Sequence, residues 1–334
     1  MFVRRWSLFA ALCLSGCQDP APKVLAFSGP TMGSSYEIKY VGERQVPQVR
    51  AVVEAELAAF DLAFSNWRED SEIARFNRHA STEPFACSPR FAAVLQLALD
   101  VAAATDGAYD PTVKPLSALY RRAKRDPSAA PDEAALAAAK ARVDFRAVTV
   151  REGSVRKQRS DVEIDLDGIV AGAAADSIAG RLTELGITSF FLQITGEILA
   201  HGEKAPGVPW LVGVVDPSSD IVGGELPLTS LPLVDRALCT SGDYRNAITV
   251  AGHRMHHVFD PRTGHSTDNG VVSASVLAES AAVADALGTA LMVLGPERAR
   301  AALPRLQRFG PLGMLLLRAD GDGGWLQDRV GWPE

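Results

Sequence analysis

The stretch from Glu279 to Leu294 (ESAAVADALGTALMVL) is almost entirely apolar and is followed at once by Gly295. A helix of this composition is hydrophobic on all sides, so the rest of the chain has to fold around it. Only Asp285 and Thr289 interrupt its interior, and their spacing of four residues puts them on one face, one turn apart. A carboxylate there is costly unless it is paired or liganded, and Asp and Thr oxygens suit a hard cation such as Mg²⁺. A hydrogen bond from the aspartate to a neighbouring loop is the alternative.

The stretch Leu238–Gly264 contains a second concentration of polar chemistry. Four of the six histidines of the chain lie within it or next to it. Imidazole has an ordinary pKa near working pH, so it is the usual general base or metal ligand. The simpler interpretation is a hairpin with surface histidines, because residues 247–250 and 255–259 read as two short strands around a glycine turn. Adjacent strand residues point to opposite faces, so only one of His256 and His257 would face a cleft.

A strand, a glycine turn and a helix follow one another between residues 162 and 186. An alternating apolar pattern up to Leu166 predicts the strand, which breaks at Asp167-Gly168 and runs into the helix. Free backbone N–H groups and the dipole at such a helix start favour an anion. The spacing matches neither GxGxxG nor a P-loop, so a dinucleotide-binding Rossmann unit is not supported.

The remaining pattern mixes helices and strands in no regular order. The alternation of Tyr36, Ile38 and Tyr40 predicts a strand, and the Ser88-Pro89 pair predicts a helix start. Arg121–Ala130 is polar and reads as a loop. Further elements are expected as helices over 48–64, 70–77 and 131–142, a hairpin over 148–159, a strand over 190–199 with a break at Gly196, strands over 210–215 and 271–276, and a turn at 320–324. Residues 226–234 and 236–238 lead into the stretch that begins at Leu238.

Composition narrows the function classes. The chain has 334 residues, of which 47% are hydrophobic and 22% charged, as is ordinary for a globular protein with a sizeable core. The net charge is −6, and the Lys/Arg-rich block that stands out is Arg121–Arg125. This balance argues against nucleic acid as the main partner.

The first residues have the pattern of an export signal. Arg4 and Arg5 precede a short apolar run, and Leu14-Ser15-Gly16-Cys17 resembles a bacterial lipobox. We therefore expect a lipoprotein signal peptide over 1–16, lipid on Cys17, a tether over 17–26 and a catalytic domain over 27–334. The protein would then be anchored in a membrane of the bacterial cell envelope and face the periplasm. An ordinary signal peptide that ends in cysteine is the alternative.

Eight short motifs occur in a fixed order along the chain. They are Thr31-Met32-Gly33, FSNWREDSEIARFN, GAYDPTVKPL, IDLDGIVAGAAAD, ITGEILAHG, CTSGDYRN, HHVFDPRTG and VADALGTALMVLG. Each is weak alone, but together they resemble the ApbE-type FAD:protein FMN transferases from Gly29 to about Gly295. The export signal agrees, since members of that family are commonly periplasmic lipoproteins.

The resemblance implies an α+β fold, a two-lobed catalytic module with mixed or antiparallel sheets flanked by helices and FAD in the cleft between the lobes. It also implies an Mg²⁺-dependent reaction that moves FMN from FAD to a Thr or Ser hydroxyl of a target protein and releases AMP. The targets would be extracytoplasmic electron-transfer proteins. Phosphoryl transfer of this kind needs a cation on the phosphates and a base for the acceptor hydroxyl, in agreement with the residue types found above.

The motifs also imply roles by position. His257, three residues before Asp260, matches the family's catalytic histidine. Asp285 and Thr289 match its side-chain metal ligands, and Gly168 matches a ligand that acts through its backbone carbonyl. The flavin-nucleotide contacts fall on Met32, Trp67, Ala108, Tyr109, Asp110, Asp165 and Ala171.

Two departures from the family pattern lie near these positions. The usual Asp-Leu-Gly-Gly-Ile-Ala-Lys-Gly reads DLDGIVAG over 165–172, so the charged residue before the last glycine is Ala171 and one FAD contact is expected to be lost. The usual Gly-Gly-Asp/Glu reads Thr195-Gly196-Glu197. The first departure keeps open a non-catalytic, flavin-binding periplasmic lipoprotein. An FAD pyrophosphatase, which would use water as acceptor and release FMN and AMP, is the other alternative.

Overall fold

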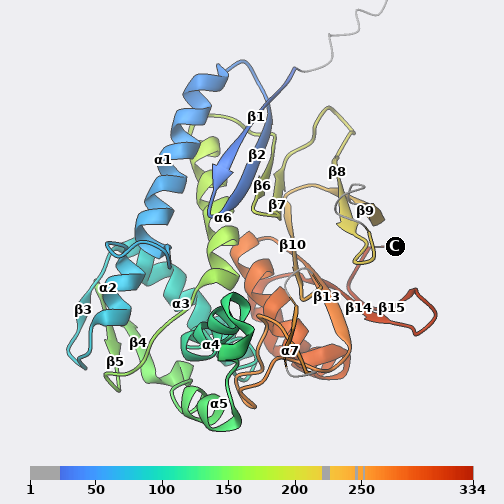
Figure 1. The fold of residues 1–334 in the computed structure, drawn as a ribbon. Coiled ribbons are helices and arrows are strands. Elements are labelled where there is room, and N and C mark those ends of the chain that lie inside the picture. Colours follow the sequence, from blue (N-terminus) through green and yellow to red (C-terminus); the bar gives the residue numbers. More distant parts are fainter. Residues whose placement is uncertain (1–22, 220–225, 245–246, 251–252, 334) are drawn as a thin grey trace, which may run out of the picture.

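An eight-stranded sheet forms the centre of the molecule (Figure 1). The computed structural model describes residues 23–219, 226–244, 247–250 and 253–333. Every neighbouring pair of strands in this sheet is antiparallel. In spatial order the strands are β1 (Val24–Thr31), β2 (Ser34–Val41), β6 (Phe190–Ile194), β7 (Glu197–His201), β10 (Arg236–Gly242), β13 (Val271–Ala278), β14 (Gly313–Ala319) and β15 (Trp325–Val330).

The two faces of the sheet carry different cores, because side chains alternate along each strand. Val276 of β13 joins the main core beneath the helices, whereas Leu277 joins a smaller core on the other face. Together the helices and the antiparallel strands confirm the predicted α+β class, while the two-lobed arrangement stays a prediction. The main core includes side chains of α1 (Val46–Phe64), α3 (Pro89–Ala104), α6 (Asp167–Glu184) and α7 (Ala281–Leu306), and the smaller core includes those of the hairpin β8 (Trp210–Val215) and β9 (Pro227–Leu233).

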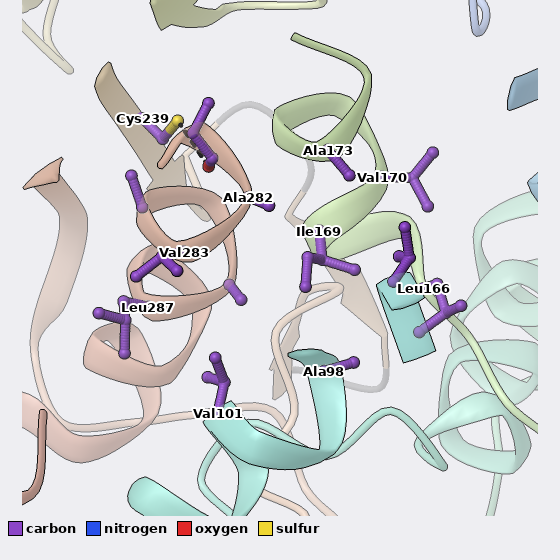
Figure 2. Close-up of a cluster of buried hydrophobic side chains, with 14 of the residues drawn as sticks. Ala98, Val101, Leu166, Ile169, Val170, Ala173, Cys239, Ala282, Val283 and Leu287 are labelled. Carbon is purple, nitrogen blue, oxygen red and sulfur yellow. Dashed lines mark hydrogen bonds between the residues drawn. The ribbon is translucent and has the colours of Figure 1, made fainter. Parts of the chain in front are cut away.

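Helices α6 and α7 pack closely at the centre of the main core (Figure 2). Gly172 permits the approach, because a Cβ there would lie 2.3 Å from the carbonyl oxygen of Ala281. Asp176 fixes the start of α7, since its carboxylate accepts hydrogen bonds from Ser280 Oγ and from the Ala281 N–H, each at 2.7 Å. The first turns of α6 therefore lie against the part of α7 that carries Asp285.

The remaining elements are short. A three-stranded sheet has the order β3 (Phe85–Ala86), β5 (Ser154–Lys157), β4 (Val148–Arg151), and a two-stranded one pairs β11 (Ile248–Val250) with β12 (His253–Met255). The other helices are α2 (Glu72–Arg78), α4 (Lys114–Arg125) and α5 (Glu133–Lys140), with 3₁₀ turns at Pro127–Ala129, Phe145–Ala147 and Gln307–Phe309. Within the described ranges, no helix is both long and apolar enough to cross a membrane.

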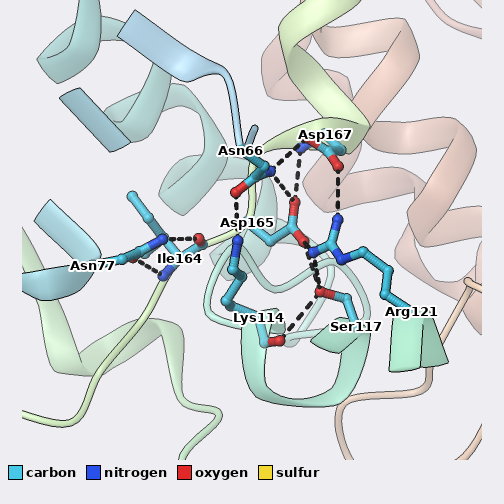
Figure 3. Close-up of polar contacts among 8 residues, drawn as sticks. All are labelled: Asn66, Asn77, Lys114, Ser117, Arg121, Ile164, Asp165 and Asp167. Carbon is cyan, nitrogen blue, oxygen red and sulfur yellow. Dashed lines mark hydrogen bonds and ion pairs between the residues drawn. The ribbon is translucent and has the colours of Figure 1, made fainter. Parts of the chain in front are cut away.

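The predicted strand that ends at Leu166 is wrong, because this segment joins no sheet of the described structure. Its alternating side chains Val162, Ile164 and Leu166 are nevertheless fully buried. The side chain of Asn77 takes the place of a partner strand. Its Oδ1 accepts from the N–H of Ile164 at 2.8 Å, and its Nδ2 donates to the Ile164 carbonyl at 2.9 Å (Figure 3). Asparagine can satisfy both backbone groups because its side chain carries a donor and an acceptor.

Two further boundaries differ from the prediction. The segment Arg121–Ala130, predicted as a loop, is helical up to Arg125, because α4 is amphipathic and buries one face. The second strand of the histidine hairpin ends at Met255 instead of residue 259. His256 and His257 both lie beyond this strand, so the alternation of strand side chains does not set their orientations.

The N-terminal boundary of the folded part lies earlier than predicted. Residues 24–26, assigned above to the tether, pair with β2 as the start of β1. The burial of side chains alternates here as in other strands, because Phe27 is buried and its neighbours on both sides are more exposed. The expected signal peptide and the lipid site at Cys17 lie outside the described residues.

The strand predicted over 190–199 has its predicted break at Gly196, but the break is a turn, in which Thr195 and Gly196 join β6 to β7 as a hairpin. Thr195 has a φ of 54°, a left-handed conformation that strains a β-branched residue. Thr195→Gly should therefore raise the free energy of unfolding by about 1 kcal/mol. Urea denaturation measures this change, and Gly196→Ala, at a φ of 117°, should shift stability the other way. A Thr195→Gly variant less stable than the parent would contradict the strain.

Candidate functional site

A cavity of about 570 Å³ collects most of the predicted site residues. Its walls come from the β1–β2 turn, the segments after α1 and α3, helix α4, the start of α6, the segment after β12, and α7. This volume lies within the range of pockets that bind small molecules and cofactors. The predicted residues in its wall are Met32, Trp67, Ala108, Tyr109, Asp110, Asp165, Gly168, His257 and Thr289.

A second cavity of about 530 Å³ adjoins the first. Met32, Trp67 and Asp167 belong to the walls of both, so the two cavities lie side by side. Ala171 lines the second cavity, as does Thr195 of the β6–β7 turn. Two adjacent cavities suit an elongated ligand with two ring systems, such as a dinucleotide, better than a compact ligand.

The β1–β2 turn and a tryptophan form the shared wall. Met32 and Gly33 have φ of 47° and 74°, the two left-handed positions of a two-residue hairpin turn. A methionine in this conformation is strained, and such strain is often found where a turn meets a ligand. Trp67 is 82% exposed, and an indole so open beside a cavity is available to stack on a flat ring.

Tyr109 and Asp110 differ in what they offer to a ligand. Both oxygens of Asp110 are occupied, Oδ1 by the N–H and hydroxyl of Thr112 at 2.7 and 2.6 Å and Oδ2 by the Phe145 N–H at 3.0 Å. Burial nevertheless raises the pKa of Asp110 to about 6. The hydroxyl of Tyr109 is buried and has no hydrogen-bond partner among the described residues. Tyr109 is therefore the better candidate for a ligand contact, and Asp110 shapes the turn beneath it.

The packing of α6 on α7 places three predicted metal-ligand positions near one another. The carboxylate of Asp285 is 6% exposed and accepts a hydrogen bond from the Gly172 N–H at 3.1 Å. A Cβ added to Gly168 would lie 3.1 Å from Thr289 Oγ1, so this hydroxyl faces the backbone of residue 168. Thr289 Oγ1 also lies 3.3 Å from Ser241 Oγ. Gly168 and Thr289 line the cavity, whereas Asp285 is not one of its lining residues.

These oxygens fit a hard cation that takes its remaining ligands from a substrate. Burial, then Glu197 and other carboxylates, raise the pKa of Asp285 well above its ordinary value. No Lys or Arg of the described chain forms an ion pair with Asp285, so no basic side chain there favours its ionised form. The described residues contain no group of three or more His, Cys, Asp or Glu side chains able to hold a metal. Mg²⁺ commonly combines one or two carboxylates with phosphate oxygens and water, which agrees with this set.

Of the two adjacent histidines, only His257 lines the cavity. Its ring centroid lies 6.4 Å from that of Tyr120. The side chain is exposed at the cavity, yet crowding protein atoms displace much of the water around the ring. This desolvation, with nearby His256 and Lys124, lowers the pKa of His257 from 6.5 to about 4, against the opposite effect of Asp243. The imidazole is thus neutral near neutral pH and able to accept a proton.

His256 holds the segment in place instead. It is 1% exposed, and its Nε2 donates to the Thr267 carbonyl at 2.9 Å while its Nδ1 accepts from the Val258 N–H at 3.3 Å. Because both ring nitrogens are engaged, these bonds assign the Nε2–H tautomer. The side chain of Asp243 lies close, with 3.6 Å between its Oδ2 and Nε2. His265 is exposed and lies near Glu133, with 3.5 Å between its Nε2 and Glu133 Oε2, so His256, His257 and His265 have different surroundings.

A polar network in the wall of the cavity was not predicted from the sequence (Figure 3). Asp165, predicted as a nucleotide contact, has its oxygens occupied by Ser117, Arg121, Asn66 and the Asp167 N–H. Arg121 also pairs with Asp167 at 3.3 Å. The missed signal was the amphipathic pattern of α4, which brings the one basic block of the sequence to the cavity. A further member is Lys114, which donates to Asn66 Oδ1 at 2.5 Å.

Comparison with known proteins agrees with this geometry. A sequence model of the ApbE family matches residues 32–309, which include every cavity residue named above. This chain belongs to the ApbE family. It is 36% identical over 305 residues to the FAD:protein FMN transferase of Vibrio cholerae, and the match covers 90% of each chain. It is 33% identical over 336 residues to the FAD:protein FMN transferase of Klebsiella pneumoniae, and the match covers 96% of this chain and 94% of the relative.

The fold of this ApbE-family member also matches a solved structure. Superposition on the structure titled "Flavin Transferase ApbE from Vibrio cholerae" gives a TM-score of 0.80 at 30% identity, covering 92% of this chain and 97% of the other.

The departure at Ala171 lies in the second cavity, where Arg68 is a basic wall residue. Arg68 is bound to Asp61 at 3.2 Å and to Asp70 at 2.7 Å, so its charge is already balanced.

Proposed function

We propose that this protein transfers FMN from FAD to a hydroxyl of a target protein. The observation that carries the proposal is one cavity that joins a neutral histidine, the hydroxyl and carbonyl oxygens of Thr289 and Gly168, and the open indole of Trp67. These are the groups that a flavin phosphotransfer requires: a base, a cation site and a stacking surface. The relatives named above carry the same activity in their names.

His257 acts as the base in this proposal. Its neutral ring takes the proton of the acceptor Thr or Ser hydroxyl while that oxygen bonds to the phosphorus of the FMN half. The bond between the two phosphates of FAD breaks in the same step, and AMP leaves. Attack by a neutral hydroxyl is slow, and a positioned base typically contributes about 10²–10⁴-fold.

Asp285, Thr289 and the Gly168 carbonyl hold Mg²⁺ in this proposal, as their oxygen chemistry allows. When bound, the cation neutralises charge on the pyrophosphate. Met32 and Trp67 orient the flavin nucleotide along the two cavities, and the unpartnered hydroxyl of Tyr109 bonds to it.

Hydrolysis of FAD is the second candidate activity, and the exposure of His257 favours it, because water can reach the same base.

Analysis of the reaction products distinguishes transfer of FMN from hydrolysis of FAD. The protein is incubated with FAD and Mg²⁺, with and without an acceptor domain, and soluble flavin and nucleotide are quantified by chromatography. AMP that appears only with the acceptor, without matching FMN, supports the transferase. Equal FMN and AMP without the acceptor would identify a pyrophosphatase, and unchanged FAD would contradict both.

The cellular address is part of the proposal. Leu14-Ser15-Gly16-Cys17 supports a lipoprotein that is cleaved before Cys17, lipidated there and anchored at the periplasmic side of the envelope. Cys17→Ser should leave the chain uncleaved at this site or release it from membranes. Fractionation and the mass of the N-terminal peptide measure both. A processed Cys17→Ser protein that stays tightly membrane-bound would contradict the assignment.

A further inference from the structure

Arg121 is fixed along one edge of its guanidinium. Its Nη2 donates to Asp165 Oδ2 at 2.5 Å and to Ser117 Oγ at 2.7 Å. The side chain of Asp165 is only 6% exposed, and its other oxygen accepts from the N–H of Asp167 at 3.2 Å. A buried carboxylate with several donors holds an arginine in one orientation, because the guanidinium is a rigid planar fork.

The other edge of Arg121 is held weakly. Its Nη1 lies 3.3 Å from Asp167 Oδ2, beyond the usual length of a charge-assisted hydrogen bond. The side chain of Asp167 is 61% exposed, so water competes for this contact. Both residues line the first cavity, and Asp167 lines the second as well. The weakly held edge therefore lies where a ligand in the first cavity can reach it.

We propose that Arg121 binds a phosphate group of the nucleotide substrate through this edge, and that Asp167 occupies the edge while no substrate is bound. This inference rests on the proposed function, since it concerns the pyrophosphate of FAD. Asp167 directly precedes Gly168, so the guanidinium lies beside the proposed cation site. A phosphate oxygen is a stronger partner than an exposed carboxylate, because it replaces a long contact with a direct charge-assisted one and matches the planar fork.

The other cations of the two cavities are less suited to this role. Arg68 is bound to Asp61 and Asp70. Lys124 lies one turn beyond Arg121 on α4, is exposed, and has its ammonium 6.0 Å from the ring centroid of Tyr120. An ammonium on a flexible stem is not pre-oriented in the way that an anchored guanidinium is.

The test is the affinity of the intact protein for FAD and for riboflavin, which has no phosphate, measured by flavin fluorescence and by competition. Arg121→Gln should weaken FAD binding about 10- to 100-fold, the loss of one charge-assisted bond, and should leave riboflavin affinity nearly unchanged. Arg122→Gln is the matched control, because it removes the same charge from an exposed position on the same helix. Equal losses for FAD and riboflavin, or equal FAD losses in both variants, would overturn the inference.

Asp167→Asn keeps the test decisive even where Arg121→Gln folds poorly. It should tighten FAD binding several-fold, because the competing charge is gone, and should not change riboflavin binding. In the Arg121→Gln background this gain should largely disappear, since the two residues share one contact. A gain of the same size in both backgrounds would show simple repulsion between Asp167 and the substrate and would overturn the exchange. Failure of the unmodified protein to bind FAD would instead refute the proposed function.

Discussion

Replacing His257 with alanine is expected to slow FMN transfer by about 10²–10⁴-fold at saturating FAD, while FAD and Mg²⁺ still bind. The reason is that the ring lines the cavity as a neutral base and is not a ligand of either in the proposed site. Single-turnover transfer to one acceptor domain measures the effect, together with FAD affinity on the same variant. A defect that vanishes at saturating FAD would contradict the role.

His265→Ala is the matched control for this variant. His265 belongs to the same segment but is exposed and lies near Glu133, with 3.5 Å between His265 Nε2 and Glu133 Oε2. It should transfer FMN at the parent rate. The adjacent His256 is unsuitable as a control. Its buried ring satisfies two backbone groups, so His256→Ala should destabilise the fold by about 1–3 kcal/mol and disturb the neighbouring base indirectly.

The pH profile gives a second check on His257. A lowered pKa favours the neutral ring, so the base form persists as the pH falls and is lost only near pH 4. At saturating Mg²⁺, which keeps the proposed ligand Asp285 ionised, the acid limb of kcat/KM should thus lie near pH 4 rather than 6.5. The acid limb of kcat should lie higher, because bound phosphates favour the imidazolium. A kcat/KM limb at 6.5 would mean that the ring is not desolvated.

Replacing Asp285 with alanine is expected to lower FMN transfer by about 10³-fold or more, because one ligand of the cation that neutralises the pyrophosphate is gone. The change removes a carboxylate rather than core volume, so the fold should remain largely intact. Transfer rates across a Mg²⁺ titration measure the loss. Parent-like activity with the parent's Mg²⁺ dependence would show that the assignment is wrong.

Asp285→Asn separates charge from shape at this site. The amide oxygen can still accept from the Gly172 N–H, so the packing of α6 on α7 is kept. Burial raises the pKa of Asp285, so its carboxyl group keeps a proton to higher pH in the folded state than in the unfolded chain. The free energy of unfolding that this protonation contributes is lost as pH rises. Asp285→Asn should therefore melt no lower than the parent near neutral pH without Mg²⁺, and Mg²⁺ with ADP should stabilise only the parent.

The parts that sequence predicted well are those governed by local pattern. The apolar run before Gly295 is buried in α7, and the alternation around Ile38 is β2. The segment ending at Leu166 shows the limit of that reasoning. Its alternating burial was read correctly, but an asparagine distant in sequence, Asn77, replaced the partner strand. No local pattern reveals such a contact.

The sequence predicted which residues line the candidate site, but not how these residues contact one another. Family motifs supplied the residues that line the cavity, because ligand contacts are kept at fixed places in the motifs. The contacts of Arg121 with Asp165 and Asp167 could not be read from them, since they join α4 to the start of α6 across distant sequence. The different roles of His256 and His257 could not be predicted either. They depend on the course of the backbone after β12, where the sequence pattern predicted that the strand continues.

The most direct test of the central claim is the intact mass of a purified acceptor domain after incubation with this protein, FAD and Mg²⁺. The account predicts a covalent FMN adduct on one Thr or Ser, absent when that residue is replaced by alanine and strongly delayed with the His257→Ala variant. An acceptor whose mass stays unchanged while FAD is consumed, or an adduct that forms equally fast with His257→Ala, would contradict it.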